Sequence, residues 1–171
     1  SCATALLEYQ LDNFADDLKD LLTESEIVDV YKMGLDSLNK LEKLVDKLGN
    51  SCCFHRFPSL LYTNDKKTIK KIEHEYAFRI SNGFECKLIK EDSNPFPFSI
   101  KCGLLCENGG AQVNPYLFTK LMIDNAKNQN KIFENTEVVQ YEKIGNIYVV
   151  KTKFGETIKC KKIIFATGYN Y

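Results

Sequence analysis

The sequence predicts an α+β fold in which helices pack on a mixed sheet. Three observations lead to this class. The first fifty residues carry an amphipathic helical pattern, the middle of the chain alternates strand and helix signals, and a two-residue hairpin signal stands at Gly145-Asn146. With 171 residues, 44% of them hydrophobic, the chain can build one ordinary core or two small ones.

Composition restricts the partners and the compartment. Lys and Arg together number 23, as do Asp and Glu, so the net charge of zero favours neither nucleic acid nor a membrane surface. No apolar run approaches the roughly 18 residues of a membrane span. Seven cysteines without a secretory signal favour reduced thiols. We therefore expect a cytoplasmic protein whose partner is a small molecule.

Residues 1-50 are predicted to be helical. Thr23 and Glu26 form a capping box, in which each side chain satisfies a backbone N–H group of the other residue. From Ile27 to Leu48 apolar residues then recur every three or four positions, and Gly49 supplies a C-terminal stop. One face of this helix should be buried and the opposite face should be in water.

Residues 51-106 combine strand and helix signals. The stretch CCFHRFPSLLYT suits a strand with an irregular start near Pro58, because proline cannot donate to a sheet. A helix should follow from about Asp65 to Asn82 and end at Gly83. Its inward face is expected to carry Ile69, Ile72, Tyr76 and Ile80. Two further strands, FECKLIK and IKCGLLC, flank a loop with two prolines.

Residues 107-171 carry clear start and stop signals. After a predicted turn at ENGGAQ, Asn114 is an N-cap and Pro115 occupies the first position of a helix that runs to about Asn128. Strands should then lie on both sides of Gly145-Asn146. A last strand, IKCKKIIFA, leads into Ala166-Thr167-Gly168.

No catalytic or metal-binding pattern stands out among the reactive residues. Cys102 and Cys106 lack a second cysteine pair at the spacing of a zinc site. His55 follows Cys52 and Cys53, but successive side chains of a strand point to opposite faces, so we expect no metal site. The G-x-S-x-G, P-loop and G-x-G-x-x-G motifs are absent. Arg56 and Arg79, the only arginines, are expected at the surface.

The closing stretch is the remaining candidate for a binding site. A strand that ends in Ala166-Thr167-Gly168 lets its backbone come close to a large flat ligand, and a glycine there can take a positive φ. The plain alternative is a core strand that leaves the sheet through a turn.

The order of these pieces points to a known family. Gly110 to Pro115 matches a G-x-V-x-P element with one additional residue, Val138 lies in the strand that follows the helix, and Ala166-Thr167-Gly168 ends the last strand. This order resembles the middle of FAD-dependent oxidoreductases of the D-amino-acid oxidase and glycine oxidase superfamily. In that family the valine meets the adenine side of FAD and the A-T-G strand end passes close to the cofactor.

The resemblance implies a fold and a division of the chain. The fold is the middle part of a glutathione-reductase-type FAD oxidoreductase, without the N-terminal dinucleotide-binding βαβ unit. Residues 1-50 would be a helical segment of the FAD-binding half, and residues 51-106 an α+β segment like the substrate domain. Residues 107-171 would supply the helix, hairpin and A-T-G strand of the FAD-binding half.

The resemblance also implies a function. The longer protein would oxidise an amine, amino acid or similar small substrate by hydride transfer to FAD. Its cofactor contacts within this chain would be Val138, Ala166, Thr167 and Gly168, and no catalytic residue is assigned. The segment alone is expected to be inactive, to bind FAD weakly and to self-associate through exposed apolar surface.

Two alternatives from other classes remain open at this point. One is a stand-alone α+β ligand-binding or interaction module without flavin. The other is a thiol-based redox protein that uses Cys52-Cys53, or Cys102 and Cys106, and this alternative predicts an accessible thiol with a lowered pKa.

Overall fold

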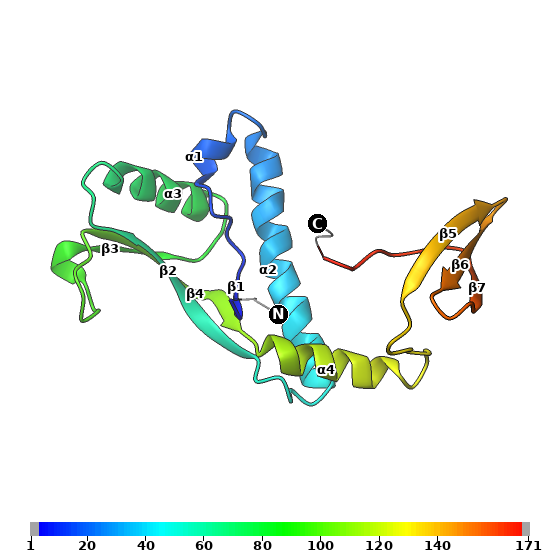
Figure 1. Cartoon of the computed structure of the whole chain (residues 1–171). Helices are drawn as coiled ribbons and strands as arrows, with labels where there is room; N and C mark the ends of the chain where they lie inside the picture. Colours follow the sequence, from blue (N-terminus) through cyan, green and yellow to red (C-terminus); the bar gives the residue numbers. More distant parts are fainter. Residues whose placement is uncertain (1–3, 169–171) are drawn as a thin grey trace. The chain divides into compact units, whose positions relative to one another are not determined.

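A computed structural model describes residues 4–168 of the chain, which divides into two compact units (Figure 1). Unit 1 runs from Ser1 to Ala126 and unit 2 from Lys127 to Tyr171. Within the described residues, unit 1 holds β1 to β4 and α1 to α4, and unit 2 holds β5 to β7. Helices and antiparallel sheets occur together, so the predicted α+β class is confirmed.

Strand β4 is the centre of the sheet in unit 1. β2 pairs antiparallel with it along one edge, and β3 and β1 pair antiparallel with the other edge. The strands are β1 Leu6–Glu8, β2 His55–Thr63, β3 Lys87–Lys90 and β4 Cys102–Gln112. Because β4 has partners on both sides, it is the most buried of these strands.

The predicted turn at ENGGAQ is wrong, because these residues continue β4. The register between β2 and β4 shifts between Phe57 and Ser59, so β4 bulges opposite Pro58. A Cβ atom at Gly109 would stand 2.7 Å from the Cβ atom of Cys106. Glycine is therefore needed at this position for close packing in the sheet. In the sequence alone, the same Gly-Gly pair resembles a turn signal.

The expectation of helix from the first residue is also corrected. Leu6–Glu8 form β1, and residues 1–3 lie outside the described part. β1 pairs with the end of β4, and just beyond it the Tyr9 N–H group donates to the Gly109 carbonyl at 3.2 Å. The open edge of β4 supplies hydrogen-bond partners that the local sequence does not reveal.

Helix α2, Glu24–Lys47, forms as the sequence predicts. Its capping box is present: the Thr23 N–H group donates to Glu26 Oε2 at 2.8 Å, and the Glu26 N–H group donates back to Thr23 Oγ1 at 3.4 Å. Gly49 follows the helix with φ +90°. The buried face carries Ile27, Val28, Tyr31, Leu38 and Val45.

The other helices of unit 1 are α1 Ala15–Leu18, α3 Ile69–Ser81 and α4 Pro115–Ala126. The N-cap predicted for α4 is confirmed, because the Leu117 N–H group donates to Asn114 Oδ1 at 3.0 Å. The inward face predicted for α3 is partly wrong: Ile80 is 48% exposed, whereas Glu75 and Arg79 are buried.

The core of unit 1 lies between β4 and the helices α2 and α3. The ring of Tyr31 in α2 packs on Phe78 in α3 and on Phe84, with centroid distances of 5.9 and 5.7 Å. Tyr9 stacks on Phe84 at a centroid distance of 6.1 Å. Aromatic packing therefore joins the segment after β1 to both helices.

Unit 2 is an antiparallel meander in the order β5-β6-β7. Its strands are β5 Val138–Ile144, β6 Ile147–Thr152 and β7 Thr157–Cys160. The hairpin predicted at Gly145-Asn146 is confirmed, with Gly145 at φ +59°.

The last strand is shorter than predicted. β7 ends at Cys160, and the described residues beyond it, 161–168, form no strand. The side chains of Ile164 and Phe165 are 88% and 62% exposed. A strand needs a neighbour for its backbone groups, and the described part of this unit pairs none with these residues.

Gly34 gives a test of the packing between α2 and the segment after β1. A Cβ atom there would collide with the Tyr9 carbonyl oxygen and stand 3.1 Å from the carbonyl carbon. Alanine favours a helix over glycine by up to about 1 kcal/mol, but a clash with backbone costs about 1–3 kcal/mol. We expect Gly34→Ala to lower the free energy of unfolding, measured with urea, by about 1–2 kcal/mol.

The neighbouring Met33 provides the control, because its side chain is 68% exposed on the same helix. Met33→Ala should change the free energy of unfolding by less than about 0.5 kcal/mol. A Gly34→Ala protein at least as stable as the parent would show that α2 does not approach Tyr9 as described.

Candidate functional site

A buried ion pair lies at the centre of unit 1. Arg79 Nε donates to Glu75 Oε1 at 2.8 Å, and the two side chains are only 2% and 1% exposed. Both residues lie on α3, four positions apart, so they share a helix face. The expectation that Arg79 lies at the surface is therefore wrong. The available signal was the E-x-x-x-R spacing of Glu75 and Arg79, which fall on the same helix as buried Ile72 and Phe78.

The Glu75 carboxylate has donors from two further helices. The Tyr31 hydroxyl of α2 donates to Oε1 at 2.9 Å, and the Ala15 N–H group at the start of α1 donates to Oε2 at 2.7 Å. With Arg79 these groups give the carboxylate three donors, which is what a buried charge requires. Burial raises the pKa of the Tyr31 hydroxyl, so it remains a donor.

The other end of Arg79 reaches toward β1 and β4. Nη1 donates to Gln10 Oε1 at 2.7 Å, to the Tyr9 hydroxyl at 3.2 Å and to Cys106 Sγ at 3.2 Å. The guanidinium also lies over the rings of Tyr9 and Tyr31, at 5.5 and 5.4 Å from their centroids. One cation therefore connects α3 with a thiol in the central strand.

Cys106 has a neighbouring thiol, Cys86. A hydrogen bond from Cys86, the charge of Arg79 and the hydrogen bonds of Tyr9 and Arg79 hold the pKa of the Cys106 thiol at about 6, against the opposing effect of burial. The hydrogen bond to Cys106 and burial raise the pKa of Cys86. Of the two thiols, Cys106 therefore loses its proton first, while Cys86 stays protonated.

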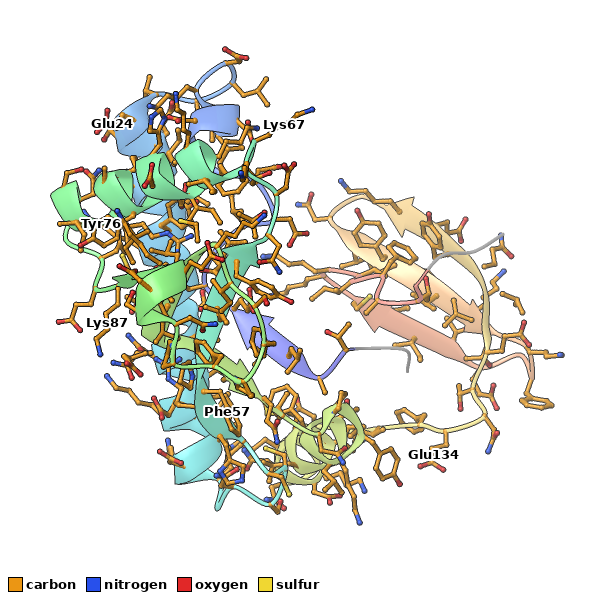
Figure 2. All side chains as sticks on the ribbon, turned by 90° about the vertical axis from the view of Figure 1, so that its left-hand side faces the viewer. Glu24, Phe57, Lys67, Tyr76, Lys87 and Glu134 are labelled. Atoms are coloured by element: carbon orange, nitrogen blue, oxygen red, sulfur yellow. The ribbon has the colours of Figure 1, made fainter. Side chains whose placement is uncertain are left out.

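A cavity of about 690 Å³ opens beside this cluster. Tyr9, Cys86 and Cys106 lie in its wall, and Lys87, labelled in Figure 2, also lines it. The remaining lining residues are Leu35, Asn39, Arg56, Ile80, Gly83, Phe84, Glu85, Leu105, Glu107, Asn108 and Gly109. The cavity brings a small molecule within reach of two thiols.

Arg56 is a charged residue in the wall of the cavity. Its Nη2 atom donates to Asn39 Oδ1 at 2.8 Å, and its Nε atom lies 3.7 Å from Glu42 Oε2. The Nη1 atom is buried without a hydrogen-bond partner among the described residues. The side chain is 19% exposed, so the surface position expected for Arg56 is only partly correct.

The residues predicted to contact FAD all lie in unit 2. Val138 begins β5 and is 52% exposed, and residues 166–168 are exposed. Gly168 has φ +74°, and a Cβ atom there would meet no atom within 4 Å. The ring of Tyr141 in β5 packs on Phe165 at 5.2 Å, so this strand is held beside the segment that leads to Ala166. An open, exposed backbone of this kind leaves room for a large flat ligand.

Residues 4–168 contain neither a cluster of metal ligands nor a membrane-spanning helix. No group of three or more His, Cys, Asp or Glu residues in this part is arranged to hold a metal ion. No helix in the same part is long and apolar enough to span a bilayer.

A family model described as FAD dependent oxidoreductase (DAO) matches residues 2–170. The chain belongs to this family. FAD is therefore the cofactor of the family. No curated protein sequence matches the chain.

Solved structures of DAO-like proteins share the fold. Glycine oxidase from Geobacillus kaustophilus is 17% identical with a TM-score of 0.76, and the match covers 98% of this chain and 45% of that one. L-proline dehydrogenase from P. horikoshii is 21% identical with a TM-score of 0.63, covering 77% and 36%. L-α-glycerophosphate oxidase from Mycoplasma pneumoniae with FAD bound is 20% identical with a TM-score of 0.51, covering 70% and 34%. The chain spans less than half of each.

The buried ion pair should be essential for the stability of unit 1. Arg79→Met leaves Glu75 charged and buried with two donors, so we expect the free energy of unfolding to fall by about 3–5 kcal/mol in a urea titration. Lys40→Met removes an exposed ion pair of the same i,i+4 spacing, with Asp36, and should cost less than about 1 kcal/mol.

A double variant separates the pair from general loss of packing. Glu75→Leu combined with Arg79→Met removes both charges, so its loss of stability should be smaller than the sum of the two single losses. Additive losses would contradict an energetic coupling between the two side chains.

Proposed function

We propose that this chain is the middle segment of a flavoprotein that oxidises a small amine or amino acid by hydride transfer to FAD. The observation that carries the proposal is the family match over residues 2–170 combined with the open backbone at Gly168. When bound, FAD supplies the acceptor for the hydride. The residues of this chain contribute binding, orientation and exclusion of water.

Unit 2 supplies the proposed cofactor contacts. Ala166, Thr167 and Gly168 would place their exposed backbone against the flavin. Glycine at position 168 tolerates the positive φ and has no side chain to block the closest approach. Val138, half-exposed at the start of β5, would add an apolar contact on the adenine side. These roles follow the order of the motifs in the family.

The sheet of unit 1 is proposed to form one wall of the substrate site. An exposed aromatic group is present there: Tyr62 in β2 lies 5.4 Å from Phe98, which in turn lies 5.4 Å from Phe96. An apolar wall lowers the local dielectric and excludes water from a hydride-transfer site. No acid or base is assigned, since the FAD itself accepts the hydride.

The isolated chain is proposed to be inactive. Its 171 residues contain no G-x-G-x-x-G phosphate-binding motif, so the pyrophosphate of FAD would lack its usual helix N-terminus. The exposed Ile164 and Phe165 side chains would favour self-association. The free thiols of the described residues fit a cytoplasmic location.

The names of the similar structures favour one substrate class. Two of them, a glycine oxidase and an L-proline dehydrogenase, act on amino acids by name, whereas the third is named for glycerophosphate, a phosphorylated alcohol. We therefore propose a carbon–nitrogen bond as the site of oxidation, and the alcohol is the competing outcome.

The first test is an absorbance spectrum of the gene product that extends this chain in both directions, purified without added cofactor. We expect a yellow protein whose flavin bands bleach anaerobically with glycine, L-proline or a related amine, because hydride transfer reduces the flavin. Bleaching by glycerophosphate alone would overturn the substrate class. A colourless protein that binds no added FAD would overturn the proposal as a whole.

Two glycines provide a matched test of the cofactor contact. Gly168 and Gly155 have φ values of +74° and +91°, and a Cβ atom at either meets nothing within 4 Å, so the backbone cost of valine is similar. In the longer protein Gly168→Val should weaken FAD binding at least about tenfold, since a tenfold loss needs only about 1.4 kcal/mol of steric cost.

Gly155→Val should leave FAD affinity within about twofold, because this glycine lies in the turn between β6 and β7. Affinity is measured by flavin fluorescence titration of the apoprotein. Equal affinities of the two variants would contradict the contact assigned to Gly168.

A further inference from the structure

We propose that Cys86 and Cys106 form a redox-active dithiol in the wall of the cavity of unit 1, which a hydroperoxide that enters the cavity oxidises to a disulfide. Both cysteines belong to unit 1, whereas the proposed flavin contacts belong to unit 2. The inference is independent of the proposed oxidation of amines.

The strand register places the two cysteines opposite each other. β3 and β4 are antiparallel, with Lys87 opposite Leu105, so one further step along both strands sets Cys86 opposite Cys106. Directly opposite residues of an antiparallel pair have Cα atoms about 4.5–5.5 Å apart, within the range of about 4.4–6.8 Å that a disulfide accepts. Both cysteines also line the same cavity, which agrees with this placement.

The pair Cys86 and Cys106 differs from the pair Cys102 and Cys106, which the sequence spacing indicates. Cys102 and Cys106 lie four residues apart on one strand, and at about 3.3 Å per residue their Cα atoms are separated by about 13 Å, too far for a disulfide. No sequence pattern marks Cys86, because its partner lies twenty positions away and becomes its neighbour only through the pairing of β3 with β4.

The surroundings of Cys106 favour a thiolate. Arg79 Nη1 donates to Sγ at 3.2 Å, and the Tyr9 hydroxyl lies 3.7 Å from the same atom. The charged and titratable groups around this sulfur are Arg79 and Glu75 of α3, Tyr9 after β1, and Cys86 before β3, while the facing residue of β2 is Ser59.

Glu75 does not cancel the effect of Arg79 on the thiol. Its carboxylate is also held by Tyr31 and Ala15, and it contacts Nε of the guanidinium, so Nη1 remains directed at Cys106. A buried cysteine without such a cation is an inert apolar residue. Cys102 is an example, because burial and Glu73 raise its pKa.

Access is the second requirement for a reactive thiol. Cys86 and Cys106 both line the cavity of about 690 Å³, and Cys86 is partly exposed. Cys106 itself is 1% exposed, which favours a reagent as small as hydrogen peroxide over larger electrophiles. The Arg79 cation beside the sulfur also stabilises the negative charge that develops on the leaving oxygen.

The reaction has two steps. The Cys106 thiolate attacks one oxygen of the peroxide, the O–O bond breaks, and the departing hydroxide takes a proton to give water and a sulfenic acid. The Cys86 sulfur then attacks Cys106 Sγ, the S–O bond breaks, and a second water leaves as the disulfide forms. Two thiols lose two electrons and two protons in total, and one peroxide is reduced to two waters.

The test is mass spectrometry of the 171-residue chain after a short treatment with hydrogen peroxide. We expect a loss of about 2 Da, reversed by dithiothreitol, and a peptide pair linked through Cys86 and Cys106 after digestion under acid quench. The rate should rise with pH through an apparent pKa of about 6 and then level off, because the thiolate is the attacking form.

Three single variants complete the experiment. Cys86→Ser should abolish the disulfide and leave a sulfenic acid at Cys106 that dimedone traps, whereas Cys106→Ser should abolish both products. Cys102→Ser is the matched control on the same strand and should change the rate by less than about twofold. Cys86→Ser keeps the test decisive even if the fully buried position 106 tolerates no serine.

The proposal is overturned if peroxide leaves both thiols free to alkylation after denaturation. It is equally overturned if the first oxidation product maps to the exposed Cys53, or if the rate rises only above about pH 8, as for an unperturbed thiol. None of these outcomes bears on FAD, which is absent from the assay.

Discussion

Unit 1 depends on the buried ion pair between Glu75 and Arg79. Two charges that are removed from water must be fully satisfied, and the partners come from elements that are far apart along the chain. Ala15 of α1 and Tyr31 of α2 serve the carboxylate, while groups near β1 and in β4 serve the guanidinium. The position of α3 relative to the other elements is thus fixed by polar geometry as well as by apolar packing.

The same cation gives unit 1 a chemical property that its family membership does not explain. Arg79 Nε is held by Glu75, while Nη1 of the same guanidinium donates to Cys106 and to the residues after β1. The flavin contacts proposed from the family lie in unit 2, around the exposed backbone at Gly168. The proposed flavin contacts and the thiol pair beside the cavity therefore belong to different units of the chain.

The sequence was most informative where a residue interacts with its near neighbours. The capping box at Thr23, the N-cap at Asn114 and the turn at Gly145 all form as predicted, since each bond closes within a few residues. Two of the predictions that failed concern sheet pairing. The glycines of β4 resemble a turn and the run at Ile164 resembles a strand, because the local sequence specifies neither the strands that pair with β4 nor a partner for Ile164.

The sequence by itself determined the α+β class, the start and stop of α2, the N-cap of α4, the hairpin and the order of motifs that resembles its family. Only the tertiary structure decided that Arg79 is buried, that Cys86 faces Cys106 and that a cavity adjoins them. The physical reason is the range of the interactions. Caps, turns and periodicity act over a few residues, whereas the burial of a charge or a thiol depends on what distant strands and helices place around it.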